Sequence, residues 1–269
     1  MYRYLQQMVE AILTRHSNRH FTDEHLSIDH STAVQEFITS LRPPFEHNVI
    51  ISYHLVPENV SVVYFKGPKQ FIALETDNSI TEQTKLGFLG ELIILFCESL
   101  GVKTCWMGHY KKREVNEIVY GNTIQPMDRR LYCIIVIGYT PEKTNLLDRI
   151  SKKRFSKKTR EIESFLDDKS QQSFSDDIRF SLDLASKAPS AMNTQKWYYL
   201  IKDDNQKSSI ELGKVKGYQH FKWRFYDIDA GTAAAHCWLG LQYRNRSPLV
   251  ECTSDNAGSV WKFRLESNI

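Results

Sequence analysis

Residues 188–197 read Ala188-Pro189-Ser190-Ala191-Met192-Asn193-Thr194-Gln195-Lys196-Trp197, and this stretch decides the fold. Pro189 must end the apolar helical pattern that runs from Ile178 to Ala185, because proline lacks the backbone donor and restricts the residue before it. The aromatic and β-branched residues from Trp197 to Ile201 then predict a strand. The loop between them is dense in side-chain donors, which either bind a polar ligand or stabilise an ordinary helix-to-strand turn.

A second polar loop lies near the start of the chain. An apolar stripe predicts a helix that ends near Thr14, and its members are Leu5, Met8, Val9, Ile12 and Leu13. The loop that follows reads Arg15-His16-Ser17-Asn18-Arg19. Its two guanidinium groups, with a hydroxyl between them, suit a phosphate and a second anionic or carbonyl acceptor. The alternative is a solvated basic helix end, which the helix dipole favours.

The composition predicts a globular cytoplasmic protein. The chain has 269 residues, 41% of them hydrophobic, and its formal net charge of +3 is too small to indicate nucleic-acid binding by itself. The first residues lack the apolar run of a signal peptide. The apolar stretch from Leu86 to Leu100 contains Glu91 and Glu98 and is shorter than the ~20 residues of a membrane span. Secretion and membrane insertion are therefore not expected.

The spacing of cysteine and histidine argues against a metal site. The five cysteines are odd in number, widely spaced and without a C-x-x-C pair, which fits neither a zinc site nor a disulfide framework. Four histidines show no ligand spacing with Cys or acidic residues, namely His16, His20, His220 and His236. We expect them to be satisfied core or surface histidines, and we assign no metal ligand.

Helical and strand patterns alternate in the first half of the chain. A helix is expected to end at Pro43-Pro44, and its apolar residues are Val34, Phe37, Ile38 and Leu41. Three strands are expected after it, at Val49–Val56, Val60–Phe65 and Phe71–Leu74. A mostly buried central helix follows, with Gly101 at its left-handed C-terminal cap. Leu131–Tyr139 then predicts a strand covered on both faces.

The second half repeats this order after a charged connector. The connector is assigned to 151–174, the first half to 1–150 and the second half to 175–269. Each half is expected to hold a central β-sheet flanked by helices, which gives an α+β fold class.

Three further elements are expected in the second half. Asp229 is expected to cap a helix that contains Gly231 and Ala233-Ala234-Ala235, whose small side chains permit close packing. Val260–Leu265 predicts an edge strand. Residues 212–223 are expected to form a loop that shapes a substrate pocket.

Both polar loops resemble segments of the FMN-dependent nitroreductase family. Its members carry R-x-S-x-R/K after a first helix and P-S-x-x-N-x-Q-P-W before a strand, and residues 15–19 and 189–197 match almost in full, with Lys196 in place of the usual proline. A third segment, Gly101-Val102-Lys103-Thr104-Cys105-Trp106-Met107-Gly108, resembles the family's G-x-x-T-x-W/P-x-G. The resemblance implies a nitroreductase-like fold and an FMN cofactor.

The order of these segments implies a fused pseudo-dimer. Typical family members hold both loops near the start of one subunit and bind FMN between two subunits. Here more than half the chain separates the loops. Residues 41–48 stand where the first half should carry P-S-x-x-N, and the second half shows no R-x-S-x-R loop before Ala185. The chain is similar to a fused branch of the family. This implies one FMN site between two halves, with no partner subunit required.

The resemblance assigns the FMN phosphate to the first loop. It implies that Arg15 and Ser17 bind the phosphate, with help from Lys153 or Arg154 at the start of the connector. It places Arg19 near N1 of the flavin, where a fixed positive charge stabilises the anionic reduced ring.

The other two segments are implied to contact the flavin ring and the ribityl chain. Met107 and Gly108 would offer backbone N–H groups to N5 and O4. Trp106 and Trp197 are expected to be core or pocket-wall residues. The remaining residues that we assign to cofactor binding are His16, Trp106, Pro189, Ser190, Ala191, Asn193 and Gln195.

The implied activity is hydride transfer. An FMN-dependent oxidoreductase would pass a hydride from NAD(P)H through flavin N5 to a nitroaromatic, a quinone or a similar small-molecule acceptor. No side-chain nucleophile or general base is required, so no catalytic residue is assigned. A non-redox FMN-binding or flavin-handling protein on the same fold is the alternative. A nucleic-acid role for Lys152–Lys158 is a third, although this run lacks interleaved aromatics and is typical of a solvated surface segment.

Overall fold

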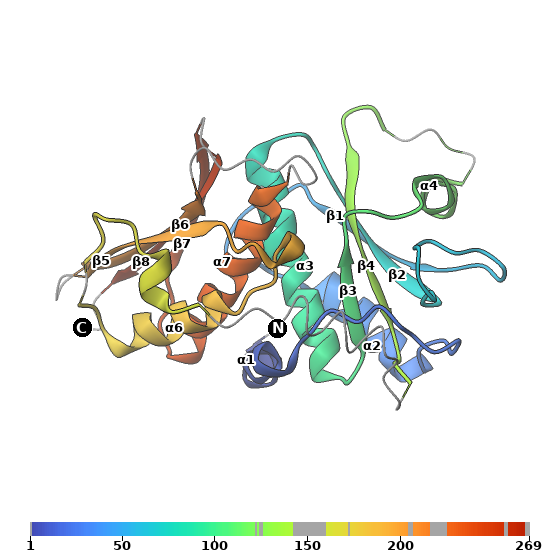
Figure 1. Cartoon of the computed structure of the whole chain (residues 1–269), viewed down its shortest axis with the longest axis horizontal. Helices are drawn as coiled ribbons and strands as arrows, with labels where there is room; N and C mark the ends of the chain where they lie inside the picture. The colour runs from blue at the N-terminus through green and yellow to red at the C-terminus, as the bar shows by residue number, and fades with distance from the viewer. Residues whose placement is uncertain are drawn as a thin grey trace.

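Two antiparallel sheets flank a pair of central helices in the computed structural model, which describes residues 2–121, 123, 126–141, 160–171, 173–203, 207–215, 225–255 and 258–266. The helices are α3 (Ile80–Ser99) and α7 (Tyr226–Tyr243), and they pack against each other between the sheets (Figure 1). This arrangement confirms the predicted α+β class.

The first sheet, sheet A, has the strand order β1-β2-β4-β3. Its strands are β1 (Ile50–Leu55), β2 (Gln70–Thr76), β3 (Lys103–Met107) and β4 (Arg130–Gly138). The structure also describes four other helical elements in this half, namely η1 (Tyr2–Tyr4), α1 (Leu5–Thr14), α2 (Ile28–Ser40) and α4 (Lys112–Tyr120). α3 covers one face of sheet A and α4 lies on the other (Figure 1). β4 is buried after its first residue, which confirms the strand covered on both faces.

The helix ends in this half follow the sequence signals. α1 ends at Thr14, and α2 ends before Pro43. After α3, Gly101 has a φ of +77°. The N–H groups of Gly101 and Val102 donate to the carbonyls of Glu98 and Cys97, at 2.9 Å each, and so complete the left-handed C-terminal cap that was predicted.

One predicted strand in this half is wrong, and two elements were missed. Residues 60–65 form no strand, and bends begin at residue 62. Val62 and Val63 are buried in a small second core on the α4 side of sheet A. Their β-branched side chains pack an irregular loop against the sheet and add no strand. β3 was missed because it lies inside the third family-like segment, Gly101–Gly108. α4 was missed because Val115 is the only buried residue of that helix.

The second sheet, sheet B, repeats the strand order as β5-β6-β8-β7. Its strands are β5 (Trp197–Asp203), β6 (Lys207–Lys214), β7 (Leu249–Asp255) and β8 (Gly258–Glu266). The shorter helical elements of this half are η2 (Ile162–Phe165), α6 (Asp176–Ser186) and η3 (Ala191–Asn193). α6 stops before Pro189, and β5 begins at Trp197, as the opening stretch predicts.

The prediction of an edge strand at Val260–Leu265 is wrong. These residues lie in β8, which pairs with β6 on one side and β7 on the other. Trp261 and Phe263 are fully buried, whereas Lys262 forms an ion pair with Glu211 at 2.9 Å. Buried and exposed side chains therefore alternate along β8, because one side of the sheet is buried and the other faces solvent. An edge strand has the same pattern, so the sequence could not distinguish the two.

The predicted cap and loop in this half also differ from the structure. α7 begins at Tyr226, so Asp229 lies inside its first turn and does not cap it. The Asp229 carboxylate accepts instead from the backbone N–H of Ala191, at 3.1 Å. Leu212, expected in a loop, is fully buried in β6. Residues 216–224 lie outside the described residues, and both β6 and β7 were missed.

Part of the predicted connector is packed structure. Ile162 and Phe165 of η2 are buried, and the N–H of Asp167 donates to the carbonyl of Tyr199 at 2.7 Å. Residues 142–159, which include Lys153 and Arg154, lie outside the described residues. The boundaries of the two halves at 150 and 174 stay predictions.

α3 and α7 contact each other reciprocally through glycines. A Cβ atom on Gly87 would lie 2.1 Å from the carbonyl oxygen of Ile228, and one on Gly231 would lie 1.9 Å from that of Thr84. Only glycine permits such an approach. The residue numbers differ by 144 both between Gly87 and Gly231 and between Thr84 and Ile228. Together with the shared strand order, this indicates an approximate two-fold relation between the halves.

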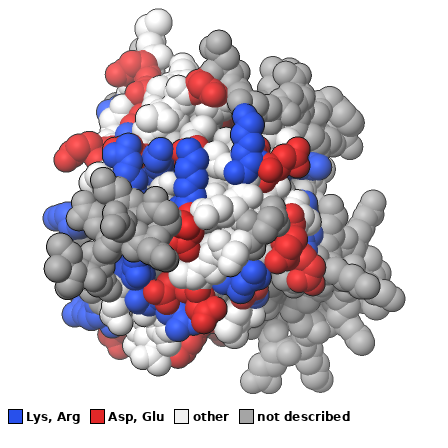
Figure 2. Space-filling view, turned by 90° about the vertical axis from the view of Figure 1, so that its left-hand side faces the viewer, with Lys and Arg blue, Asp and Glu red and all other residues white. Residues whose placement is uncertain are grey.

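The outer surface of sheet B carries charges of both signs. Figure 2, which views the molecule from this side, shows Lys and Arg interspersed with Asp and Glu. Arg264 of β8, for example, pairs with Glu251 of β7 at 2.7 Å. None of the helices that the structure describes combines the length and the apolar character needed to cross a bilayer.

Candidate functional site

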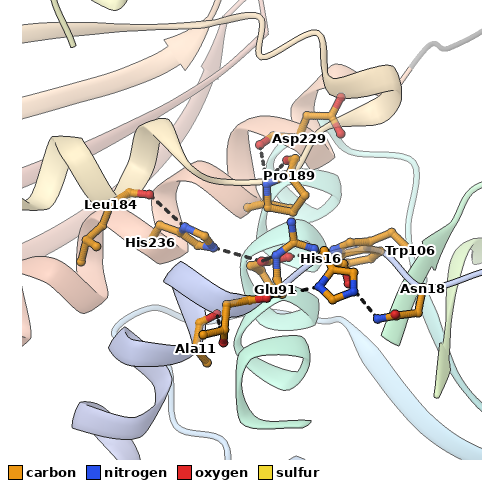
Figure 3. Close-up of polar contacts among 12 residues, drawn as sticks. Ala11, His16, Asn18, Glu91, Trp106, Leu184, Pro189, Asp229 and His236 are labelled. Carbon is orange, nitrogen blue, oxygen red and sulfur yellow. Dashed lines mark hydrogen bonds and ion pairs between the residues drawn. The ribbon is translucent and has the colours of Figure 1, made fainter. Parts of the chain in front are cut away.

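The loop after α1 lies along the open edge of β3. The backbone N–H of Asn18 donates to the carbonyl of Thr104 at 2.9 Å, and the Ser17 side chain hydrogen bonds the thiol of Cys105. The Asn18 amide also donates to the carbonyl of His16 at 3.0 Å, which fixes the turn of the loop (Figure 3). The structure therefore brings the first and third predicted segments together and covers the edge of sheet A.

The positive charges of Arg15 and Arg19 affect the pKa of a thiol in β3, that of Cys105. Burial raises the pKa of the Cys105 thiol above its usual value, although the charges of Arg19 and Arg15 and the hydrogen bond from Ser17 oppose the rise. Because burial dominates, the thiol stays protonated at neutral pH. Cys105 therefore supplies no negative charge to either guanidinium.

A buried carboxylate, Glu91 of α3, connects this loop to the second half. Glu91 Oε2 accepts a hydrogen bond from Trp106 Nε1–H at 2.8 Å, and Oε1 lies 3.7 Å from Arg15 Nε and 3.0 Å from His236 Nε2. His236 Nδ1–H donates to the carbonyl of Leu184 in α6 at 3.0 Å. Figure 3 shows Glu91 between Trp106 and His236. Glu91 and His236 are fully buried, so the connection runs through the protein interior.

Gly90 of α3 makes room for the indole ring of Trp106. A Cβ atom at position 90 would lie 2.2 Å from Cη2 of that ring. The absence of a side chain here thus allows the ring to reach Glu91.

We expect Gly90→Ala to displace the Trp106 ring and to lower the free energy of unfolding by about 1–3 kcal/mol, because overpacking forces the ring aside. The shift of the Trp106 indole N–H resonance and urea unfolding measure the two effects. Gly67→Ala is the matched control, since a Cβ atom there meets nothing closer than 3.9 Å. An unchanged resonance and unchanged stability would contradict the contact between Gly90 and Trp106.

The second loop, Pro189–Gln195, is anchored on α7. The Thr232 hydroxyl donates to the Pro189 carbonyl at 2.7 Å (Figure 3). The Asp229 carboxylate accepts from the N–H of Ala191. α7 thus holds the loop at its first residues, and α7 also carries His236.

Two predicted ligands of the second loop form hydrogen bonds within the loop or to the end of α6. Ser190 Oγ accepts from the N–H of Gln195 at 2.8 Å, and Gln195 Nε2 donates to the Ser186 carbonyl at 2.6 Å. Met192, Asn193 and Gln195 adopt positive φ values of 52°, 52° and 49°, a conformation that costs non-glycine residues free energy. These bonds fit the ordinary-turn alternative for Ser190 and Gln195, and contacts of this loop with a cofactor stay a prediction.

Sequence reasoning did not connect Glu91 with His236. In the sequence, Glu91 served only as evidence against a membrane span. A carboxylate buried in a central helix, however, needs hydrogen-bond or ion-pair partners. His236 was expected to be a satisfied histidine, and its two hydrogen bonds confirm this. Trp197 is a core residue, as expected, and stacks on Phe165 at 5.8 Å between ring centroids.

A separate cavity of about 490 Å³ lies beside α2 and β1. Its lining residues are His25, Leu26, Ser31, Gln35, Tyr53, Leu55 and Gln70. They include none of the predicted cofactor residues, so this cavity is distinct from the candidate site. Among the described residues, no three His, Cys, Asp or Glu side chains gather as a metal ion would need, and all five cysteines are free thiols.

The chain is similar to known nitroreductases. A family model described as "Putative TM nitroreductase" matches residues 7–241. The crystal structure of a putative nitroreductase from Thermotoga maritima MSB8 has 22% identity and a TM-score of 0.62 over 98% of this chain and 94% of that chain. A nitroreductase with bound FMN from Bacteroides fragilis NCTC 9343 has 13% identity and a TM-score of 0.41 over 52% of this chain and 91% of that chain. No curated protein matches the chain.

Proposed function

Because the chain belongs to the "Putative TM nitroreductase" family, we propose that it is an FMN-dependent oxidoreductase. Its reductant would be NAD(P)H, and its acceptor a nitroaromatic, a quinone or a similar small molecule. The observation that carries the proposal is Arg15, a mostly buried guanidinium at the end of α1 beside β3.

Arg15 fits the phosphate of FMN. Its side chain is 10% exposed, and its Nε–H has no hydrogen-bond acceptor among the residues that the structure describes. A buried donor without an acceptor costs about 1–3 kcal/mol, and a phosphate oxygen would satisfy it with a charge-assisted hydrogen bond. On the neighbouring strand, Thr104 Oγ1 is also buried without a partner in the described part of the chain. Two such groups on adjacent segments support an anion site.

The other residues of this region would bind and orient the flavin. Ser17 would join Arg15 at the phosphate, and Lys153 or Arg154 would add positive charge. Arg19 would place its charge near N1 of the flavin ring.

The end of β3 and the second loop would contact the ring and the ribityl chain. β3 ends at Met107, so the backbone of Gly108 follows the last paired residue of this edge strand. Backbone N–H groups at such a strand end can donate to N5 and O4. From the second half, Ser190, Asn193 and Gln195 would contact the ribityl chain or the ring edge.

The chemistry would come from the cofactor. Bound FMN supplies the capacity to accept a hydride from a nicotinamide and to pass it to the acceptor. The protein would contribute binding, orientation and the positive charges of Arg15 and Arg19, and no side chain would act as a nucleophile or general base. The two halves of one chain would form the site, as a pseudo-dimer without a partner subunit.

We expect the purified chain to be yellow and to bind about one FMN per chain, as befits a single site between two halves. Flavin absorbance against protein concentration measures the ratio, and oxidation of NAD(P)H with and without a quinone measures turnover. A chain that stays colourless after incubation with FMN contradicts the proposal, and two flavins per chain contradict the single site. Bound FMN without acceptor-dependent oxidation would favour a flavin-handling protein.

A further inference from the structure

The Glu91–His236 pair must hold a proton between its members. The Leu184 carbonyl can only accept, so His236 Nδ1 carries a hydrogen. Nε2 lies 3.0 Å from Glu91 Oε1, and a hydrogen bond at this distance needs a proton on Nε2 or on the carboxyl group. In either arrangement the pair has no net charge.

This proton determines how much of the Arg15 charge remains for an anion. A carboxylate next to a neutral imidazole would neutralise Arg15, because Oε1 lies 3.7 Å from Nε. With the proton in place, Arg15, Glu91 and His236 together carry a net charge of +1. The three side chains are 10%, 0% and 0% exposed, and a charge acts more strongly in such surroundings than in water.

The Glu91–His236 pair has no counterpart at the symmetry-related positions of α3 and α7. The offset of 144 residues that relates the two helices makes Ala235 the equivalent of Glu91, and Leu92 the equivalent of His236. Ala235 and Leu92 are also fully buried. The fold therefore accepts apolar side chains at these positions, and packing alone does not require the pair. The Glu91–His236 pair lies where the helix contact meets Arg15.

We propose that Glu91 and His236 are positioning residues for the cofactor phosphate. They hold Arg15 and Trp106 in place and, through the proton between them, preserve a net positive charge beside the first loop. α7 of the second half thereby controls how strongly a loop of the first half binds phosphate. This inference rests on the proposed function.

Substitutions that change charge separate this role from packing. His236→Gln removes the imidazole and leaves Glu91 to neutralise Arg15, so the FMN affinity should fall about tenfold. Riboflavin lacks the phosphate, and its affinity should change by less than about twofold. Glu91→Gln can still donate to His236 and accept from Trp106, so it should keep the preference for FMN over riboflavin. In the double variant the FMN affinity should return to within about threefold of the wild type.

Two reference variants calibrate the measurement. Arg15→Gln should abolish the preference for FMN over riboflavin, and Arg113→Gln, an exposed position on α4, should leave it unchanged. Fluorescence titration with each flavin gives the affinities.

Equal losses for both flavins, or a double variant weaker than His236→Gln, would overturn the inference. If the variants do not fold, nuclear magnetic resonance of the wild-type chain with labelled histidine and glutamate reports the proton directly. A neutral His236 next to an ionised Glu91 would overturn the inference there. A wild-type chain that binds neither flavin would instead contradict the proposed function. The proton measurement does not depend on flavin, so failure of the proposed function and failure of this inference can be distinguished.

Discussion

Gly231→Ala is expected to lower the free energy of unfolding by about 3 kcal/mol or more. Alanine is more favourable than glycine in a helix by about 1 kcal/mol, so helix propensity predicts the opposite sign. The loss comes from packing, because the new Cβ atom would lie 1.9 Å from the Thr84 oxygen and 2.9 Å from the Phe88 nitrogen. Both are backbone atoms and cannot rotate away. The two central helices would have to separate.

Urea unfolding monitored by circular dichroism measures this effect. Gly67→Ala, whose Cβ atom would make only ordinary van der Waals contacts at 3.9 Å, should change stability by less than about 0.5 kcal/mol. Gly87→Ala, whose Cβ atom would meet the Ile228 oxygen, should resemble Gly231→Ala. The double variant should lose less than the sum, because one separation of the helices relieves both contacts. A more stable Gly231→Ala protein would show that α3 and α7 are not in such close contact.

Glu91→Leu is expected to cost about 3–5 kcal/mol of stability, the effect of breaking a buried ion pair by removing one partner. Leucine fills a similar volume but accepts no hydrogen bond. Trp106 Nε1–H and one ring nitrogen of His236 would lose their partner inside the protein. Arg15 would lose its ion pair as well.

Glu91→Gln is the matched control for the leucine variant. Its amide can donate to His236 and accept from Trp106, so the loss should stay below about 1.5 kcal/mol. Denaturant unfolding of both variants, followed by tryptophan fluorescence, gives the comparison. Equal stability of the two variants would mean that the buried hydrogen bonds contribute little.

The sequence predicted those parts of the fold whose signals are local. The ends of α1 and α6 follow from a change of periodicity and from Pro189, and the cap after α3 follows from Gly101. β8 was misassigned as an edge strand because its neighbours in the sheet leave no trace in its own residues. The run from Val60 to Phe65 shows the converse, since strand-forming residues there pack as a loop.

The candidate site was predictable only where it depends on short motifs. The first and third segments meet at the edge of β3, and their resemblance to a known family pointed to both. Glu91 and His236 carry no motif, and 145 residues separate them in the chain. Their connection arises only when α3 and α7 pack together. No local pattern could have paired them.

The reciprocal contact of α3 and α7 also affects how this protein can vary. In a symmetric dimer of identical chains, every residue at the two-fold interface occurs twice. A mutation that introduces a charge there therefore places it at two positions at once. Here the equivalent positions belong to one chain and differ in number by 144. A single mutation at Leu92 or Ala235 therefore alters one location and leaves Glu91 and His236 untouched. One half can specialise while the other preserves the packing.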